Sequence, residues 1–241
     1  MKKIIIRIKE YLMNTIVQII LGLLLADLMA GAFHWFEDSY FDYCLDLPFL
    51  GDVAKHNEMH HYFPRSIVHY SVWANMSTSV PFLAVLYIVL YFTVNERGWT
   101  EYGPLIWTAL LFTLFSNVFH RCCHMRPCEN SPIVRGLQRC GIMVSNEHHK
   151  AHHVKTNSRY CVITEYSNHL WDWIGLWRGL EFVVEKTTGY KALPKPKYED
   201  YKPIHTPMHE EVKKACPRVI DRKEMRQLKK LLKRHYSCPA R

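Results

Sequence analysis

Three long apolar segments restrict the folds that are open to this chain. They run from about Ile16 to Phe36, from about Val72 to Val94 and from about Leu105 to Phe119. A helix that crosses a bilayer needs about 20 mostly apolar residues, and the first two segments supply that length while the third nearly does. Tryptophan and tyrosine gather at the segment ends, as in interfacial aromatic belts. The pattern predicts an all-α integral membrane helical bundle with about three transmembrane helices rather than a soluble bundle.

The composition of the chain changes after residue 189. The segment 190–241 is rich in lysine and proline and ends in the basic run RKEMRQLKKLLKRH. We therefore divide the chain into a membrane domain, 1–189, and a basic tail, 190–241, which is either an amphipathic helix on anionic lipid or a disordered, solvated segment. The net charge of +9 suits an anionic membrane or an acidic partner, and no helix-turn-helix, zinc-finger, RRM or KH signature supports nucleic acid.

The basic tail also predicts the orientation of the chain, because cytosolic segments carry an excess of lysine and arginine. With three spans, the polar stretches 37–71 and 120–169 lie on the same side as the tail, the cytosolic one. The four basic residues among the first nine then lie on the opposite side, so either they begin an interfacial helix or the rule is overridden. We predict that the eight scattered cysteines are reduced thiols of a cytosol-facing protein.

Four histidines lie within six residues, in the run His148-His149-Lys150-Ala151-His152-His153. On a helix with 3.6 residues per turn, these four side chains share one face. Histidine is the commonest metal ligand in proteins, whereas the alternative, a polar surface cluster, requires four of the 15 histidines to fall together by chance. The quartet predicts half of a polynuclear metal site.

Five further histidines lie near the ends of the apolar segments. His34 is four residues before Asp38, His120 is four residues before His124, and a histidine pair occupies 60–61. A spacing of four puts two side chains on one helical face. Nine histidines exceed what one zinc ion needs, but two iron ions would use them all. Asp38 is either a metal ligand or an acceptor that orients a ligand imidazole. The predicted ligands are His34, His60, His61, His120, His124, His148, His149, His152 and His153.

Other metal chemistries lack their sequence signatures here. The HExxH motif of zinc proteases is absent. Carboxylate-bridged di-iron bundles need two Glu-x-x-His elements, and only Glu58-x-x-His61 occurs. No flavin or NAD fingerprint is present either, so a redox reaction at this site would take its electrons from an external donor.

Several histidine-bearing motifs between about residues 25 and 190 form a specific set. They are Asp27-x₃-Gly31-x₂-His34-Trp35-x₂-Asp38, His60-His61-x₂-Pro64, Asn117-x₂-His120-x₃-His124 and His148-His149-x₂-His152-His153, followed by Tyr160-Cys161, Asn168 and Ile174-Gly175-Leu176-Trp177-Arg178. This set resembles the Kua family, which includes plasmanylethanolamine desaturase, the bacterial CarF proteins and the plant fatty acid desaturase 4 group. The chain departs from the family at Thr164-Glu165, where Thr-Gly is usual.

The resemblance implies an O₂-dependent di-iron lipid desaturase with its site at the cytosolic membrane face. It implies two iron ions, O₂ as co-substrate, cytochrome b5 or a similar electron donor, and a multi-pass protein of the endoplasmic reticulum. The expected reaction introduces the vinyl ether double bond into plasmanylethanolamine, a membrane ether phospholipid. Two alternatives are desaturation of an acyl chain of phosphatidylglycerol and a non-catalytic, metal-binding regulatory protein of the membrane.

Overall fold

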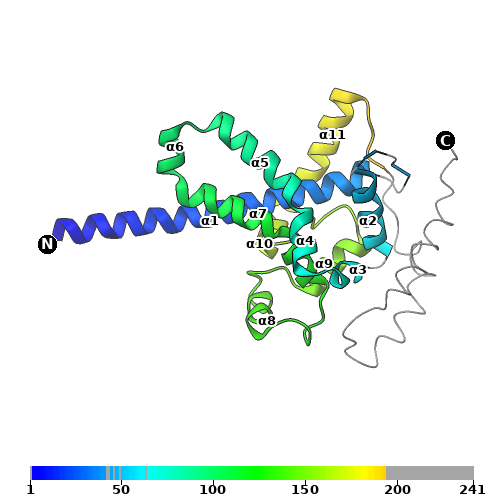
Figure 1. Ribbon diagram of the computed structural model, residues 1–241, viewed down its shortest axis with the longest axis horizontal. Helices are drawn as coiled ribbons and strands as arrows, with labels where there is room; N and C mark the ends of the chain where they lie inside the picture. The colour runs from blue at the N-terminus through cyan, green and yellow to red at the C-terminus, as the bar shows by residue number, and fades with distance from the viewer. Residues whose placement is uncertain (1, 42–43, 46, 49, 63, 194–241) are drawn as a thin grey trace.

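The computed structural model describes residues 2–41, 44–45, 47–48, 50–62 and 64–193. Most of the predicted basic tail, 194–241, lies outside the described residues. Within the described residues the chain contains helices and no strand (Figure 1). The helices are α1 (Lys2–Tyr40), α2 (Leu50–Tyr62), α3 (Ser66–His69), α4 (Val72–Thr78), α5 (Val80–Thr93), α6 (Glu96–Glu101), α7 (Gly103–His124), α8 (Pro132–Arg139), α9 (Asn146–Val154), α10 (Glu165–Trp173) and α11 (Leu176–Thr188).

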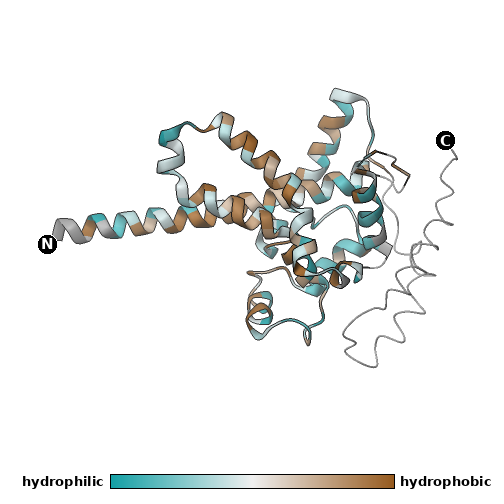
Figure 2. Ribbon diagram, in the orientation of Figure 1, coloured by the Kyte–Doolittle hydropathy of each residue, from teal (hydrophilic) through white to brown (hydrophobic). Residues whose placement is uncertain are grey.

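In the part of the chain that the structure describes, two helices are long and apolar enough to cross a membrane, and a bent pair supplies a third candidate. They are Lys9–Tyr40 in α1, Gly103–His124 as α7, and α4 with α5, whose axes differ by 42°. Apolar residues dominate α5 and much of α1 and α7, whereas α2 is mostly polar (Figure 2). The predicted all-α fold with about three spans is confirmed. The first helix, α1, is longer than its apolar segment. Its 39 residues extend about 58 Å.

The two long helices α1 and α7 pack against each other along the centre of the molecule (Figure 1). Gly22 permits the close approach, since a Cβ atom there would lie 2.4 Å from the carbonyl oxygen of Leu105. Further along, the rings of His34 and His120 are 5.0 Å apart. The helices therefore run in the same direction, and the predicted ligands at their C-terminal ends come together at one end of the pair.

The segment after α9 is buried against α1 although it is not helical. Ala26 of α1 packs with Val162 and Ile163, and Trp35 packs with Tyr160 and with an indole of α11. These contacts hold residues 160–163 beside the part of α1 that carries the predicted ligands.

The α4–α5 pair bends at Ser79, one residue before α5 begins. Pro81 lies in the first turn of α5, where proline is tolerated because its missing N–H is not needed at a helix start. The Ser79 side chain is fully buried and its hydroxyl lies 3.2 Å from that of Ser116 on α7. The bend is therefore anchored against α7.

The cysteine prediction is wrong at two positions. Cys44 and Cys128 are each disulfide-bonded, whereas Cys122, Cys123, Cys140 and Cys161 are free thiols. Sequence spacing cannot reveal such bonding, because disulfide connectivity depends on which loops the fold brings together.

Candidate metal centre

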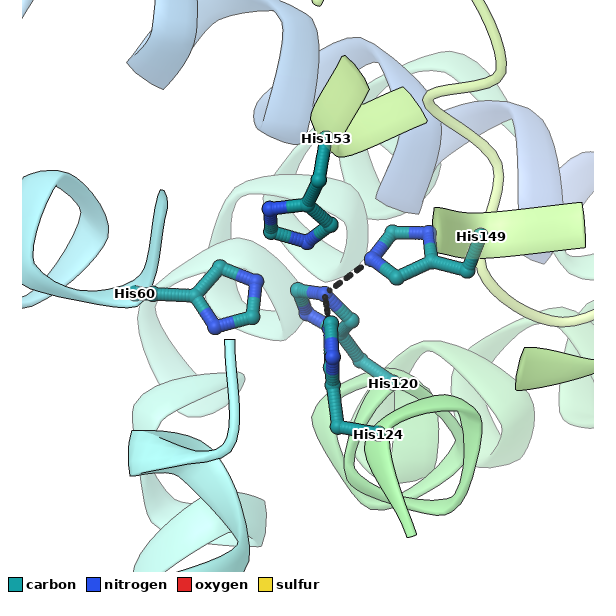
Figure 3. A group of neighbouring side chains, drawn as sticks. All are labelled: His60, His120, His124, His149 and His153. Atoms are coloured by element: carbon teal, nitrogen blue, oxygen red, sulfur yellow. Dashed lines mark hydrogen bonds between the residues drawn. The ribbon is translucent and has the colours of Figure 1, made fainter. Parts of the chain in front are cut away.

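Five histidines from three helices form the first ligand group. Each offers one ring nitrogen, and these nitrogens all lie within 4.8 Å of one another. Figure 3 shows the five imidazoles converging from different directions on a common space. Within the group, the Nε2 atom of His120 is 2.8 Å from Nε2 of His149 and 3.2 Å from Nε2 of His124. The members are His60 on α2, His120 and His124 on α7, and His149 and His153 on α9.

Three histidines and a carboxylate form the second ligand group, whose ligand atoms also lie within 4.8 Å of one another. Asp38 is at its centre. One carboxylate oxygen is 2.8 Å from Nε2 of His61, and the other is 3.3 Å from Nε2 of His152 and 3.8 Å from Nε2 of His34. The group draws its members from α1, α2 and α9, so α2 and α9 supply ligands to both groups, whereas α7 contributes only to the first and α1 only to the second.

Helical periodicity explains how neighbouring histidines reach different groups. His149 and His153 are one turn apart on α9 and both join the first group, whereas His152 points to the second. The adjacent pair on α2 divides in the same way, with His60 in the first group and His61 in the second. Consecutive residues of a helix are about 100° apart, so the two members of the pairs 60–61 and 152–153 point to different ligand groups.

Several ring nitrogens of these groups are buried without any hydrogen-bond partner among the described residues. They include both nitrogens of His60 and of His153, Nδ1 of His149 and Nε2 of His34. A buried polar atom that forms no hydrogen bond costs about 1–3 kcal/mol, so a native fold seldom leaves several together. Metal ions would satisfy these atoms, and a histidine-rich donor set suits transition metals such as iron, zinc and copper.

Burial also sets the protonation state of the ligands outside the membrane spans. It lowers the pKa of His60, His149 and His153 well below the value of a free imidazole, and the neighbouring histidines lower each pKa further. These rings are therefore neutral at physiological pH. Neutral imidazole is the form that binds metals.

Backbone carbonyls orient two of the ligand rings. The Nδ1–H of His34 donates to the carbonyl of Tyr160 at 3.0 Å, and that of His152 donates to the carbonyl of Ser158 at 2.7 Å. Each bond places the proton on Nδ1 and turns Nε2 toward the second group, as metal-ligating histidines commonly require. Asn57 donates to Asp38 at 2.9 Å and fixes the carboxylate.

The structure does not bring His148, also a predicted ligand, into either group. Its Nδ1 atom is 3.7 Å from a carboxylate oxygen of Glu165, and its ring lies 5.4 Å from that of His169. Glu165 also accepts hydrogen bonds from the backbone N–H and the hydroxyl of Ser145, the residue that caps α9. The carboxylate at Thr164-Glu165 thus holds the start of α9 and faces His148. The other eight predicted histidines and Asp38 all lie in the two groups.

Asp27 supports the site, although the sequence did not predict this role. Asp27 is fully buried in α1 and accepts hydrogen bonds from the backbone of Val162, Ile163 and Thr164. It thereby fixes the segment whose Tyr160 carbonyl orients His34. A carboxylate inside an apolar span was the available signal, because such residues are costly unless they are paired or bonded.

The chain matches the lipid desaturase domain over residues 23–195. It belongs to the lipid desaturase domain family. The resemblance seen in the sequence is therefore confirmed, and the two ligand groups lie within the matched range. No solved structure matches the chain.

Three relatives of the chain illustrate the family, one each from a virus, an animal and a plant. A probable fatty acid desaturase of Acanthamoeba polyphaga mimivirus is 29% identical over 76% of this chain and 89% of its own length. Plasmanylethanolamine desaturase 1 of Mus musculus is 28% identical over 80% of this chain and 72% of its own. The chloroplastic fatty acid desaturase 4 of Arabidopsis thaliana is also 28% identical, over 67% of this chain and 49% of its own. The chain thus spans about half the length of that plant relative.

Proposed function

We propose that this protein is an O₂-dependent di-iron desaturase that acts on a membrane lipid. The observation that carries the proposal is the pair of ligand groups, which together draw eight histidines and one carboxylate from α1, α2, α7 and α9. Membership of the lipid desaturase domain family supports the reaction class. The candidate membrane spans support a lipid substrate, because the ligand groups lie at the ends of two of them.

The chain's own residues would hold and orient two iron ions. The first group offers five imidazoles, and the second offers three imidazoles and Asp38. Iron bound there would supply, with O₂, two external electrons and two protons, the oxidant that removes one hydrogen from each of two adjacent carbons and leaves an alkene and two water molecules. The protein keeps His60, His149 and His153 neutral by burial, orients His34 and His152 through backbone carbonyls and buries the histidines of both groups. The electron donor we propose is cytochrome b5 or a similar carrier.

The substrate we propose is plasmanylethanolamine, whose alkyl ether chain would become the vinyl ether of a plasmalogen. A matched relative from mouse and one from Myxococcus xanthus are named for this activity. The second candidate is an acyl chain of a glycerophospholipid such as phosphatidylglycerol, which the matched plant relatives named fatty acid desaturase 4 support. In either case we place the protein in the endoplasmic reticulum membrane as a multi-pass protein.

The test expresses the full chain in cells that lack plasmalogens and measures acid-labile vinyl ethers together with the acyl double bonds of each phospholipid. We expect vinyl ethers with the wild-type chain and none with His149→Ala, which removes a member of the first group. His169→Ala is the matched control, because His169 belongs to neither group and should retain the product. A new acyl double bond without vinyl ether would select the second candidate. An expressed, iron-loaded chain that alters neither would refute desaturation and favour a non-catalytic role.

A further inference from the structure

A cavity of about 490 Å³ adjoins both ligand groups. His34 of the second group and His60 and His120 of the first form part of its wall. Its volume lies within the range of ligand-binding pockets. A molecule in the cavity would therefore be in contact with the metal ligands themselves.

The cavity extends away from the ligands into the membrane-spanning part of the molecule. Along α7 its lining runs from His120 back to Thr113, and seven helical residues correspond to about 10 Å. On the other helices the deepest lining residues are Ala30 of α1 and Phe82 of α5. Chain neighbours of both belong to a packed apolar cluster around Leu86, Ile106 and Leu110. We call Ala30, Phe82 and Thr113 the floor of the cavity.

The polar groups in the cavity wall are largely bonded to the protein. The side-chain amide of Asn75 donates to three backbone carbonyls at 3.0–3.2 Å. The amide of Asn117 donates to the hydroxyl of Thr78 at 2.8 Å, and the hydroxyl of Ser116 donates to the carbonyl of Thr113. Apart from ring nitrogens of the metal ligands His34 and His60, the Thr113 hydroxyl is the one side-chain polar group of this wall that is buried without a bond among the described residues. Such a wall suits a ligand that needs no hydrogen bonds.

The opposite end of the cavity is polar. It is lined by Glu37 of α1 and by Asp52, His56 and Asn57 of α2. The cavity thus has a polar mouth, metal ligands along its side and a floor with an aromatic ring. An amphiphile with a polar head and one long apolar chain matches this order of surfaces.

The bend between α4 and α5 contributes to the same cavity. Thr78, just before the bend, and Phe82, just after it, both line the space. The Phe82 ring lies 3.9 Å from the ring of Phe33 on α1, centroid to centroid. The bend therefore turns Phe82 toward α1, where its ring closes the inner end of the cavity.

We propose that this cavity holds one hydrocarbon chain of the lipid substrate, inserted methyl end first, and that Phe82 and Ala30 set the longest chain that is accepted. The proposal rests on the proposed function for the identity of the lipid. It adds the path of the chain, its direction, and two specificity-determining residues that do not bind metal.

The first test measures kcat/KM with 1-O-alkyl glycerophosphoethanolamine lipids whose chains increase by two carbons, using full-length protein in membranes. Phe82→Ala enlarges the floor, so we expect the preferred length to rise, with a gain of about fourfold for each added methylene that becomes buried. Ala30→Leu fills the floor and should shift the preference to shorter chains. Phe112→Ala is the matched control, because Phe112 stacks on Phe119 and does not line the cavity; its length profile should stay as in the wild type.

The second test needs neither iron nor turnover. A 1-O-alkyl lipid with a diazirine at the methyl end is photo-crosslinked to metal-free, full-length protein, and the labelled peptides are identified. We expect label on the peptides that carry Ala30, Phe82 or Thr113, and less of it in Ala30→Leu. Label spread over the lipid-facing helices, or length profiles unchanged in both variants, would overturn the proposal. Floor labelling in a chain that desaturates no lipid would refute the proposed function but uphold the cavity assignment.

Discussion

Asp27 provides a stringent test of how the site is supported. It is fully buried in the middle of α1 and accepts four hydrogen bonds from a segment more than 130 residues away. The donors are the backbone N–H groups of Val162 at 3.2 Å, Ile163 at 2.9 Å and Thr164 at 2.9 Å, and the hydroxyl of Thr164 at 3.0 Å. We predict that Asp27→Ala destabilises the fold and releases this segment.

The magnitude follows from the donors that lose their acceptor. Each buried N–H without a partner costs about 1–3 kcal/mol, so three of them give roughly 3–9 kcal/mol. Relaxation of the segment and the relief of burying a carboxylate reduce this sum, and we expect about 3–5 kcal/mol. Asp27→Asn keeps the oxygen that serves Val162 and Ile163 but turns an amide toward the N–H of Thr164. About half of the loss is expected for that variant.

The assay is reversible unfolding of the purified protein in detergent, followed with and without bound metal. The matched control is Thr93→Ala, since its hydroxyl bonds to a carbonyl of its own helix at an exposed site and its loss should change stability by less than about 0.5 kcal/mol. The metal-bound fraction of Asp27→Ala should also fall, because the same segment orients His34. Equal stability of the Asp27→Ala and Thr93→Ala proteins would refute the reasoning.

Three further predictions concern other positions. His148→Ala should retain the metal content of the wild type in elemental analysis, whereas His149→Ala should lose metal; equal losses would show that His148 is a ligand after all. Glu165→Ala removes two hydrogen bonds at the start of α9, and we expect the free energy of unfolding to fall by about 1–3 kcal/mol. An unchanged free energy of unfolding would show that Glu165 does not hold the start of α9. Gly31→Val would place a Cβ 2.8 Å from a buried thiol and 3.1 Å from an indole, so a loss of about 1–3 kcal/mol is expected; Gly179→Ala, where nothing lies within 4 Å, should not destabilise.

The sequence predicted which residues gather because helical spacing is a local property. His120 and His124 share a face of α7 as their spacing of four required, and His34 and Asp38 do so on α1. The division of ligands between the groups was not predictable, because it depends on how α2 and α9 are rotated against α1 and α7. That rotation sends His60 and His61 to different groups and leaves His148 facing Glu165.

Contacts between distant segments could not be predicted either. The segment 72–94 reads as one continuous span, but the helix breaks at Ser79, two residues before Pro81, which cannot continue a helix through its own position without a kink. The contact of the Ser79 hydroxyl with Ser116 of α7 could not be predicted from the sequence. Asp27 carried a signal, as a carboxylate in an apolar helix, but nothing in the sequence identified its partners around Ile163. Such pairings arise only when the fold brings the two segments together.

The most direct test of the central claim is the iron content of each ligand group. Full-length protein loaded anaerobically with iron is analysed for metal per chain and by Mössbauer spectroscopy. We predict about two iron ions per chain in the wild type, and about one in His124→Ala and in His152→Ala, which would retain different spectral components because they belong to different groups. A single zinc ion per chain, or the same residual component in both variants, would contradict the account.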